Sequence, residues 1–412
     1  MAASISRRCV RHLSTFPLLN ARPGYPPSLR NVEVILPRVP RITEGNEPQY
    51  PPVKPSMTSG SKAAKQARRA LWIDNVRSSD TPVEMIYLLN KRQRWQEVIK
   101  PFSLQSGYGH FFRDVTKTAV VDELPENIQT LAESGQVKTE VEVLTERVIE
   151  LLMVESFSIR RKKQHRIIEH KERSQSLAQN ILNLLISHLG NRFPHLTDAV
   201  VDGRCQIKSF WERGERRMQF NGEPVCSVRA KEPLGLFAQT TDEVCNGDVE
   251  GWPYNPKEIG IFQNHINPVC FPGFKYQPGH LFPHTQIYGV NFDLDRAERH
   301  NIYQEIQDNF GLMAGYAWIN ALAMYQGYCW FQDIPRPMTA QVIYTDGNRF
   351  SFYCYQANTL DLSENGSPWN NVCFQKTSLP MFTDVKDGKV RDFNVEALKL
   401  LVAFLINSPE RH

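Results

Sequence analysis

The 412-residue sequence predicts an α+β protein, in which a basic helical N-terminal part precedes a mixed α/β C-terminal part with an antiparallel hairpin. Helix formers with capping signals, and apolar residues at helical spacing, occupy much of residues 58–200. Residues 201–412 combine short aromatic and β-branched runs with turn residues. Because 41% of the residues are hydrophobic, the chain can bury a core, and whole-chain disorder is excluded.

The first residues, 1–30, have the composition of a mitochondrial transit peptide. No acidic residue precedes Glu33, whereas arginine and serine recur, and Arg7, Arg8 and Arg11 would share one side of a helix. A secretory signal would need an apolar stretch after these charges, and the sequence does not contain one there. We therefore expect import into the mitochondrial matrix, with a merely disordered basic tail as the alternative.

A proline-rich segment follows the predicted transit peptide. Ten of the 27 prolines lie in residues 17–55. Because proline fixes φ and lacks a backbone N–H, residues 31–57 are predicted to form an extended arm rather than a folded module.

Two helices are predicted next. Residues 61–77 are rich in alanine and other strong helix formers, with the basic residues gathered on one arc. Thr81, Pro82 and Glu84 then form the pattern of a capping box with proline at the first helical position. This second helix is predicted to end near Pro101, since proline cannot continue a helix.

Two longer helices complete the region. Thr139 with Glu142 has the pattern of a second capping box and is predicted to open one of them. Gly190 is predicted to end the other, because glycine favours the residue that follows a helix. The predicted apolar stripes are Val141, Leu144, Val148, Leu151 and Leu152 in the first, and Ile181, Leu182, Leu185 and Leu189 in the second.

The C-terminal part carries strand and turn signals. Residues 214–285 contain eight glycines and eight prolines, which indicates loops and short strands. The runs 339–345 and 349–356 flank the dipeptide Asp346-Gly347, which supplies positive φ for a tight turn, so they predict a β-hairpin. A final helix is predicted at about 394–406.

The stretch 310–332 carries no charged residue and approaches the roughly 20 residues needed to span a bilayer. It also contains glycines, Asn320 and Gln326, and it lacks a run dominated by leucine, isoleucine and valine. We therefore interpret it as a buried core helix followed by a loop, and we expect no membrane span.

Few residues stand in catalytic or metal-binding patterns. The eight cysteines form no C-x-x-C pair, so reduced thiols are expected rather than a zinc site. His280 and His284 stand four apart, but Pro283 interrupts any helix between them, and we interpret both as loop residues. Asp293 and Asp295 alternate as on a strand, where a solvated edge is favoured over an acid/base pair. Since phosphate-binding and nucleophile-elbow motifs are also absent from the sequence, we expect no catalytic residue, no metal and no cofactor.

Basic residues are concentrated toward the N-terminal end. Residues 1–118 hold 19 lysines and arginines against 8 acidic residues, whereas the remainder holds 29 against 36. This asymmetry predicts a surface that faces polyanions, with solvated helix faces as the alternative. Aromatic residues among the cations can stack on unpaired bases. The RNA-contact candidates are Lys62, Lys65, Arg68, Arg69 and Trp72, then Arg160, Arg161, Lys162, Lys163 and Arg166, and finally Lys208, Trp211 and Arg213.

Five stretches carry a resemblance to a known family. They are YPPVKPSMTSGSKAA at 50–64, NALAMYQG at 320–327, DGNRFSFYCYQANTL at 346–360, PWNNVCF at 368–374 and LLVAFLINSPE at 400–410. They resemble the family of mitochondrial ribosomal protein thirty of the small-subunit series, also placed in the large subunit as protein sixty-five and described as programmed cell death protein nine. The resemblance implies a component specific to mitochondrial ribosomes that pairs with its paralogue, mitochondrial large-subunit protein thirty-seven. It implies no catalytic residues.

We therefore predict a structural constituent of the large subunit of the mitochondrial ribosome, which supports mitochondrial translation by contacting large-subunit rRNA and other ribosomal proteins. The alternative is a matrix RNA-processing or RNA-modifying enzyme that uses the same basic surface. That enzyme would require a pocket of convergent polar groups, which the sequence does not reveal. A third hypothesis, an apoptosis adaptor, is supported by no interaction motif in the sequence.

Overall fold

The computed structural model describes most of the chain after the proline-rich segment. The described residues are 60–91, 93–99, 107–159, 166–214, 216–290, 292, 294–363 and 366–410. Lys65–His412 forms one compact unit, and Met1–Ala64 is a second unit of which only 60–64 are described. The predicted transit peptide, the arm at 31–57 and the basic residues 160–163 lie outside the described residues.

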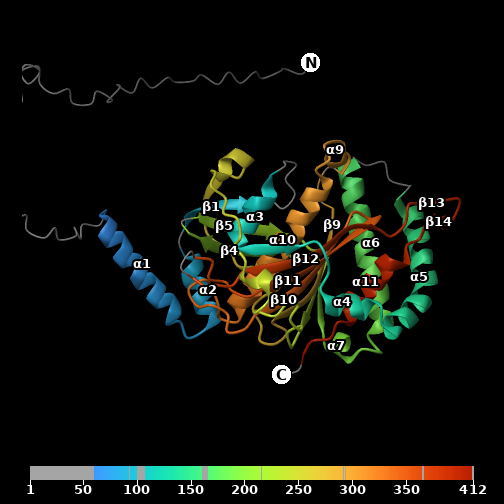
Figure 1. Ribbon diagram of the computed structural model, residues 1–412, viewed down its shortest axis with the longest axis horizontal. Coiled ribbons are helices and arrows are strands. Elements are labelled where there is room, and N and C mark those ends of the chain that lie inside the picture. Colours follow the sequence, from blue (N-terminus) through green and yellow to red (C-terminus); the bar gives the residue numbers. More distant parts are fainter. Residues whose placement is uncertain are drawn as a thin grey trace, which may run out of the picture. The chain divides into compact units, whose positions relative to one another are not determined.

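Two β-sheets form the framework of the larger unit (Figure 1). The seven-stranded sheet has the order β2-β12-β11-β10-β9-β6-β3, and the five-stranded sheet has the order β7-β1-β5-β4-β8. The seven strands are β2 (Thr118–Val121), β3 (Val200–Gly203), β6 (Cys226–Ala230), β9 (Phe282–Gly289), β10 (Met338–Thr345), β11 (Arg349–Ala357) and β12 (Asn371–Pro380). The five strands are β1 (Arg94–Ile99), β4 (Ile207–Arg213), β5 (Arg216–Gly222), β7 (Gln263–Ile266) and β8 (Phe271–Pro272). A small third sheet pairs β13 (Asp384–Lys386) with β14 (Lys389–Arg391).

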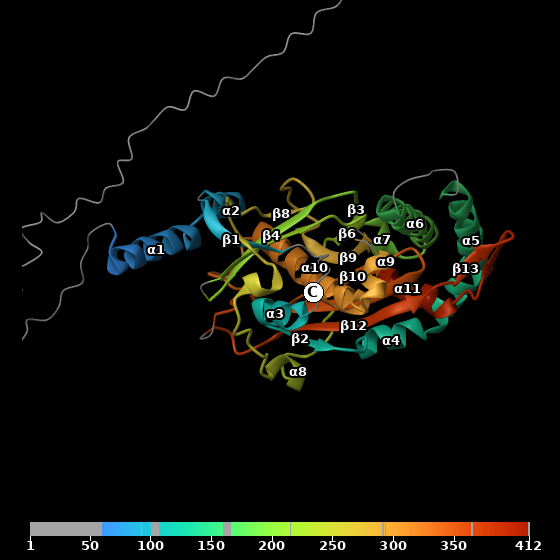
Figure 2. The same cartoon turned by 90° about the horizontal axis from the view of Figure 1, so that it is seen from above.

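Helices precede, separate and cover these sheets. They are α1 (Lys62–Arg77), α2 (Pro82–Asn90), α3 (Tyr108–Thr116), α4 (Glu126–Ala132), α5 (Gly135–Ile159), α6 (Arg166–Leu189), α7 (Pro194–Thr197), α8 (Glu243–Asn246), the 3-10 turn η2 (Pro256–Ile259), α9 (Leu294–Arg299), α10 (Tyr303–Tyr325) and α11 (Val395–Ile406). Figures 1 and 2 both show α5, α6 and α11 on one side of the seven-stranded sheet, with β1, β4 and α3 on the other.

Helix α10 lies between the two sheets and is buried along most of its length. Successive strand residues point to opposite faces, so Tyr353 and Tyr355 of β11 pack on the α10 side, while Phe352 packs against α11 on the other. Two helix glycines allow the close approach. A Cβ on Gly311 would collide with the Tyr353 ring, and one on Gly315 would lie 2.6 Å from the Tyr355 Cβ.

The C-terminal end of α11 is satisfied by side chains from the seven-stranded sheet and its surroundings. The last carbonyls of a helix lack partners within the helix. The Nε2 of Gln341 donates to the Phe404 carbonyl at 2.7 Å, and the Nε2 of buried His284 lies 2.9 Å from the Asn407 carbonyl. His195 reaches a third carbonyl of this segment at 3.0 Å, and its ring stacks on His284 with centroids 5.8 Å apart.

Several sequence predictions are confirmed. The α+β class is observed, and α1 closely matches the predicted 61–77 helix. The Oγ1 of Thr81 accepts the Glu84 N–H at 3.2 Å at the start of α2, as the capping pattern indicated. The hairpin of β10 and β11 turns at Gly347, whose φ is 102°, and α11 matches the predicted final helix. In the described residues, α10 is the predicted buried helix, and no helix is long and apolar enough to cross a membrane.

Other predictions are wrong about where elements begin and end. The second helix ends at Asn90 rather than near Pro101, because residues from Arg94 onward pair with β5 and β7 as strand β1. Helix α5 begins at Gly135 instead of Thr139, whose hydroxyl donates to the Gly135 carbonyl. The sequence was predicted to divide into a helical region at 58–200 and a mixed region at 201–412. Parallel pairing of β1 with β5 and of β2 with β12 connects these two regions, so the compact unit continues across residue 200.

Two further residues differ from their predicted settings. His284 lies in strand β9 rather than a loop, and Asp295 lies in α9 rather than on a strand; Asp293 is outside the described residues. Tertiary pairing with β6 and β10 recruits the His284 segment despite Pro283. The seven described cysteines are free and buried.

Candidate nucleic-acid interface

A basic cleft of about 480 Å³ lies where α1 meets strand β1 of the five-stranded sheet. Three of the predicted cations, Lys65, Arg68 and Arg69, line it together with Trp72. The cleft therefore brings together residues that were predicted to share one arc of this helix. The remaining lining residues are Gln93, Arg94, Trp95, Arg217 and His265. We call this set of residues the basic cleft. Lys62, the first residue of α1, is exposed.

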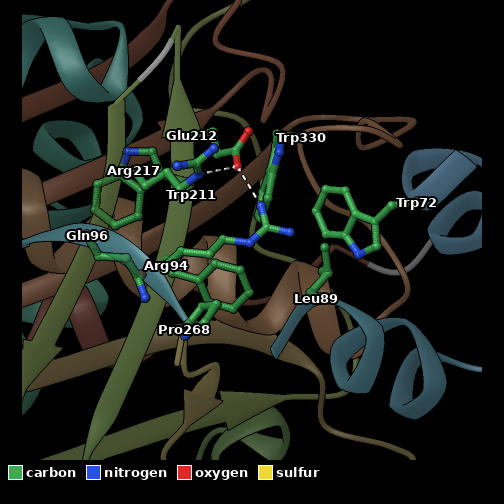
Figure 3. Close-up of a pocket in the computed structure, with 10 residues that line it drawn as sticks. Trp72, Leu89, Arg94, Gln96, Trp211, Glu212, Arg217, Pro268 and Trp330 are labelled. Carbon is green, nitrogen blue, oxygen red and sulfur yellow. Dashed lines mark hydrogen bonds and ion pairs between the residues drawn. The ribbon is translucent and has the colours of Figure 1, made fainter. Parts of the chain in front are cut away.

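One buried carboxylate organises the arginines of the basic cleft. Glu212 on β4 is 8% exposed, and its oxygens lie 2.7 Å from Arg69, 3.3 Å from Arg94 and 3.0 Å from Arg217. Arg94 and Arg217 converge on it in Figure 3. One negative charge therefore faces three guanidinium groups, so this cluster keeps a net charge of +2. The arrangement holds the cations in place and leaves an excess that attracts anions.

Trp72 is mainly a packing residue. Its Nε1 donates to the Leu88 carbonyl at 3.3 Å, and the Phe331 ring meets its edge at a centroid distance of 5.4 Å. The Arg94 guanidinium lies 4.1 Å from its ring centre, a cation–π contact that restrains this arginine in addition to its contact with Glu212 (Figure 3). The indole thus anchors α1 and orients a cation.

Trp95 is the aromatic surface that the basic cleft offers to solvent. Its side chain is 59% exposed, and its ring lies 5.2 Å from that of His265, its cross-strand partner. Large exposed aromatic rings beside cations are the usual platform for unpaired bases. Trp95 and His265 were not among the residues predicted from the sequence, Arg94 was predicted to lie in a helix, and Arg217 belongs to the basic and aromatic stretch 204–217 that the sequence suggested for RNA contact. The basic and aromatic run Lys91–Trp95 was the available signal.

The third cluster of sequence candidates is largely engaged within the fold. Trp211 is 1% exposed, its Nε1 donates to the Val115 carbonyl at 2.8 Å, and its ring packs on Tyr316, so its predicted role in base stacking is wrong. The alternation of β4 turns this residue toward α10. Arg213 pairs with Asp114 at 3.4 Å, and Lys208 is half-buried on the opposite face of β4 from Trp211.

The second cluster can be placed only in part. Arg160, Arg161, Lys162 and Lys163 lie outside the described residues. Arg166 is the first residue of α6, and its side chain is outside the description. The cluster therefore remains a prediction.

The described residues hold no group of three or more His, Cys, Asp or Glu side chains that could bind a metal ion. His280 and His284 each engage a backbone carbonyl, of Asp198 and Asn407 respectively. Burial lowers the pKa of His284 to about 3, assisted by the neighbouring His195 and opposed by the Asn407 carbonyl. Its contacts identify it as a neutral structural side chain.

Comparisons with known proteins agree with the resemblance. The model of a family described as mitochondrial 28S ribosomal protein S30 (PDCD9) matches residues 32–219 and 212–409. Large ribosomal subunit protein mL37 of Bos taurus is 25% identical over 291 residues, covering 69% of this chain and 63% of that protein. The Gallus gallus protein of the same name is 25% identical over 269 residues, covering 63% of this chain and 59% of its own. The chain thus matches about three-fifths of the length of these curated relatives.

Proposed function

Because the chain belongs to the mitochondrial 28S ribosomal protein S30 (PDCD9) family, we propose that it is a structural constituent of the mitochondrial ribosome and supports translation in the matrix. Membership in a family of mitochondrial ribosomal proteins implies a mitochondrial location and a non-enzymatic role. The proposed contribution is to contact large-subunit rRNA and neighbouring ribosomal proteins. The basic cleft is the observation that supports the rRNA contact.

We favour the large subunit over the small one. The family description refers to the small 28S particle, whereas the curated relatives are named as large-subunit proteins. Their sequence similarity extends over more than half of this chain. The paralogous protein mL37 is accordingly the proposed protein partner.

The basic cleft has the components of an RNA backbone contact. Lys65, Arg68 and Arg94 supply cations for phosphates, and each phosphate neutralised releases counterions, which favours binding. Glu212 and Trp72 restrain Arg94, so less side-chain freedom is lost when a phosphate binds. Trp95 adds a face on which an unpaired base can stack, a contribution of about 1–3 kcal/mol.

The test replaces Lys65, Arg68 and Trp95 together by alanine and follows the tagged protein through sucrose gradients of mitochondrial lysate. The proposal expects the wild-type chain to co-sediment with the large subunit. The triple variant should leave the large-subunit fraction at a lower salt concentration than the wild-type chain, because it has fewer phosphate contacts and therefore a lower affinity to begin with.

A matched control replaces the exposed Lys386 and Lys389 of the β13–β14 hairpin by alanine. This control should sediment like the wild-type chain. If the triple variant and the control sediment alike, the proposed contact between the basic cleft and rRNA is wrong. A wild-type chain that stays at the top of the gradient would overturn the ribosomal function itself.

A further inference from the structure

Helix α5 presents a line of exposed side chains away from the core. Figures 1 and 2 both show this helix at the outer edge of the helices that cover one side of the seven-stranded sheet. Its buried residues, among them Leu144 and Val148, pack with α6 and α11. The exposed line, which we call the α5 stripe, consists of Val143, Arg147, Glu150, Val154 and Phe157.

The spacing of the α5 stripe is that of a surface which pairs with another helix. Its members follow one another at alternating steps of four and three residues, the heptad spacing that keeps one line of side chains against a second helix. Val143 is 43% exposed, Val154 65% and Phe157 66%. Single exposed apolar residues are ordinary on a protein surface, whereas three on one stripe mark an interaction site.

The two polar members of the α5 stripe carry opposite charges. Arg147 and Glu150 are both exposed, and neither makes an ion pair within the described residues. They lie between Val143 and Val154. A helix that docks here must therefore present, in order, an apolar residue, an anion facing Arg147, a cation facing Glu150 and a second apolar residue. The α5 stripe has this same pattern when it is read in the reverse direction.

A second copy in antiparallel orientation matches these positions at one register. In that register Val143 of one copy faces Val154 of the other. Arg147 then faces Glu150 of the other copy, and a two-fold axis repeats both contacts. If Val143 faced Phe157 instead, the two Glu150 carboxylates would meet, and a parallel pair would place like charges opposite one another at both polar positions. Charge complementarity therefore selects one orientation and one register.

We propose that the free chain forms an antiparallel dimer in solution through the α5 stripe. A contact made by one helix from each copy is smaller than the roughly 1,200–2,000 Å² that stable complexes bury, so dilution dissociates this dimer. The inference goes beyond the proposed function, because it depends on neither the basic cleft nor ribosome assembly.

Sedimentation velocity of the purified full chain, over a wide range of concentrations, measures the self-association. The wild-type chain should shift from monomer to dimer as its concentration rises. Arg147→Glu and Glu150→Arg should each weaken dimerisation by at least about tenfold, because each substitution places like charges opposite one another. Lys257→Glu, the same change of charge at an exposed position of η2, is the matched control and should dimerise like the wild-type chain.

Mixing the two variants separates a direct contact from damage to the fold. An equimolar mixture of Arg147→Glu and Glu150→Arg should recover the dimer, since both charge pairs are again opposite in the mixed pair. Failure of the mixture to recover it would overturn the proposal. A wild-type chain that stays monomeric would also overturn it, because the α5 stripe would then serve a different occupant.

Disulfide crosslinking tests the register. A chain with Val143→Cys mixed with a chain with Val154→Cys should form a crosslinked dimer under mild oxidation, because the proposed register brings these two positions together. Each variant alone should form far less. The seven described native cysteines are buried and leave this background low. Equal crosslinking of the mixture and of the separate variants would contradict the register and overturn the proposed dimer.

Discussion

Replacing Glu212 by glutamine tests whether one carboxylate organises the basic cleft. The substitution keeps the shape of the side chain but removes the charge shared by Arg69, Arg94 and Arg217. Glutamine can still accept from one arginine. The other two then face like charges without a counter-ion in this cluster.

The expected magnitude follows from the burial of each partner. Arg69 and Arg217 are partly exposed, so each pair contributes only about 0.5 kcal/mol. Arg94 is largely buried, and a hydrogen bond between charged groups at such a position contributes about 1.5–2 kcal/mol. Because glutamine retains one neutral hydrogen bond, we expect a net loss of about 2 kcal/mol in the free energy of unfolding.

Urea unfolding measures this loss, with the exposed Glu232→Gln as control. The RNA affinity of the same variant separates two explanations. If charge alone mattered, adding a net positive charge would strengthen binding; if restraint of the arginines matters, binding weakens despite the added charge. A stability change below about 0.5 kcal/mol, within the range of ordinary surface substitutions, would refute the organising role.

Three further outcomes are expected. Gly315→Ala should destabilise the fold by about 1–3 kcal/mol, because the added methyl group would overpack against Tyr355. Gly135→Ala is the control and should not destabilise the fold, because open space surrounds Gly135. Equal denaturation midpoints for the two variants would contradict the packing described for α10. Burial lowers the pKa of His284 from 6.5 to about 3, so the unfolded state takes up a proton before the folded state does as pH falls. The free energy of unfolding should therefore be about 2 kcal/mol lower at pH 5 than above pH 6.5. His284→Gln should flatten this decline in pH-dependent thermal unfolding, and an unchanged slope would count against a neutral buried imidazole. Charge reversal at Arg160, Arg161, Lys162 and Lys163 should reduce recovery in the large-subunit fraction more than reversal at Lys386 and Lys389, and equal recovery would indicate a solvated surface.

Local signals predicted the local parts of this fold well. The capping residues of α2, the turn at Gly347 and the apolar periodicity of α11 each act within a few residues, so a single sequence reveals them. The first strand was missed because helix-compatible residues around Arg94 become a strand only by pairing with β5, more than a hundred residues away. Distant pairing carries no signal in one sequence.

The candidate site also combines residues that local sequence patterns predict with residues that only distant pairing brings together. The cations of α1 were predicted because helical periodicity places them on one arc. Trp211 was assigned to base stacking because composition does not reveal which face of a strand meets the core. Glu212 gains its importance from arginines on α1, β1 and β5, so only the tertiary structure could identify it.

Photo-crosslinking from position 95 tests most directly whether the basic cleft meets rRNA. Benzoylphenylalanine in place of Trp95, in chains assembled in mitochondria, should crosslink to large-subunit rRNA. The same group in place of Trp369, another exposed tryptophan, should give little RNA product. Crosslinks from position 95 to protein alone, or equal RNA crosslinking from both positions, would contradict the assignment of this cleft.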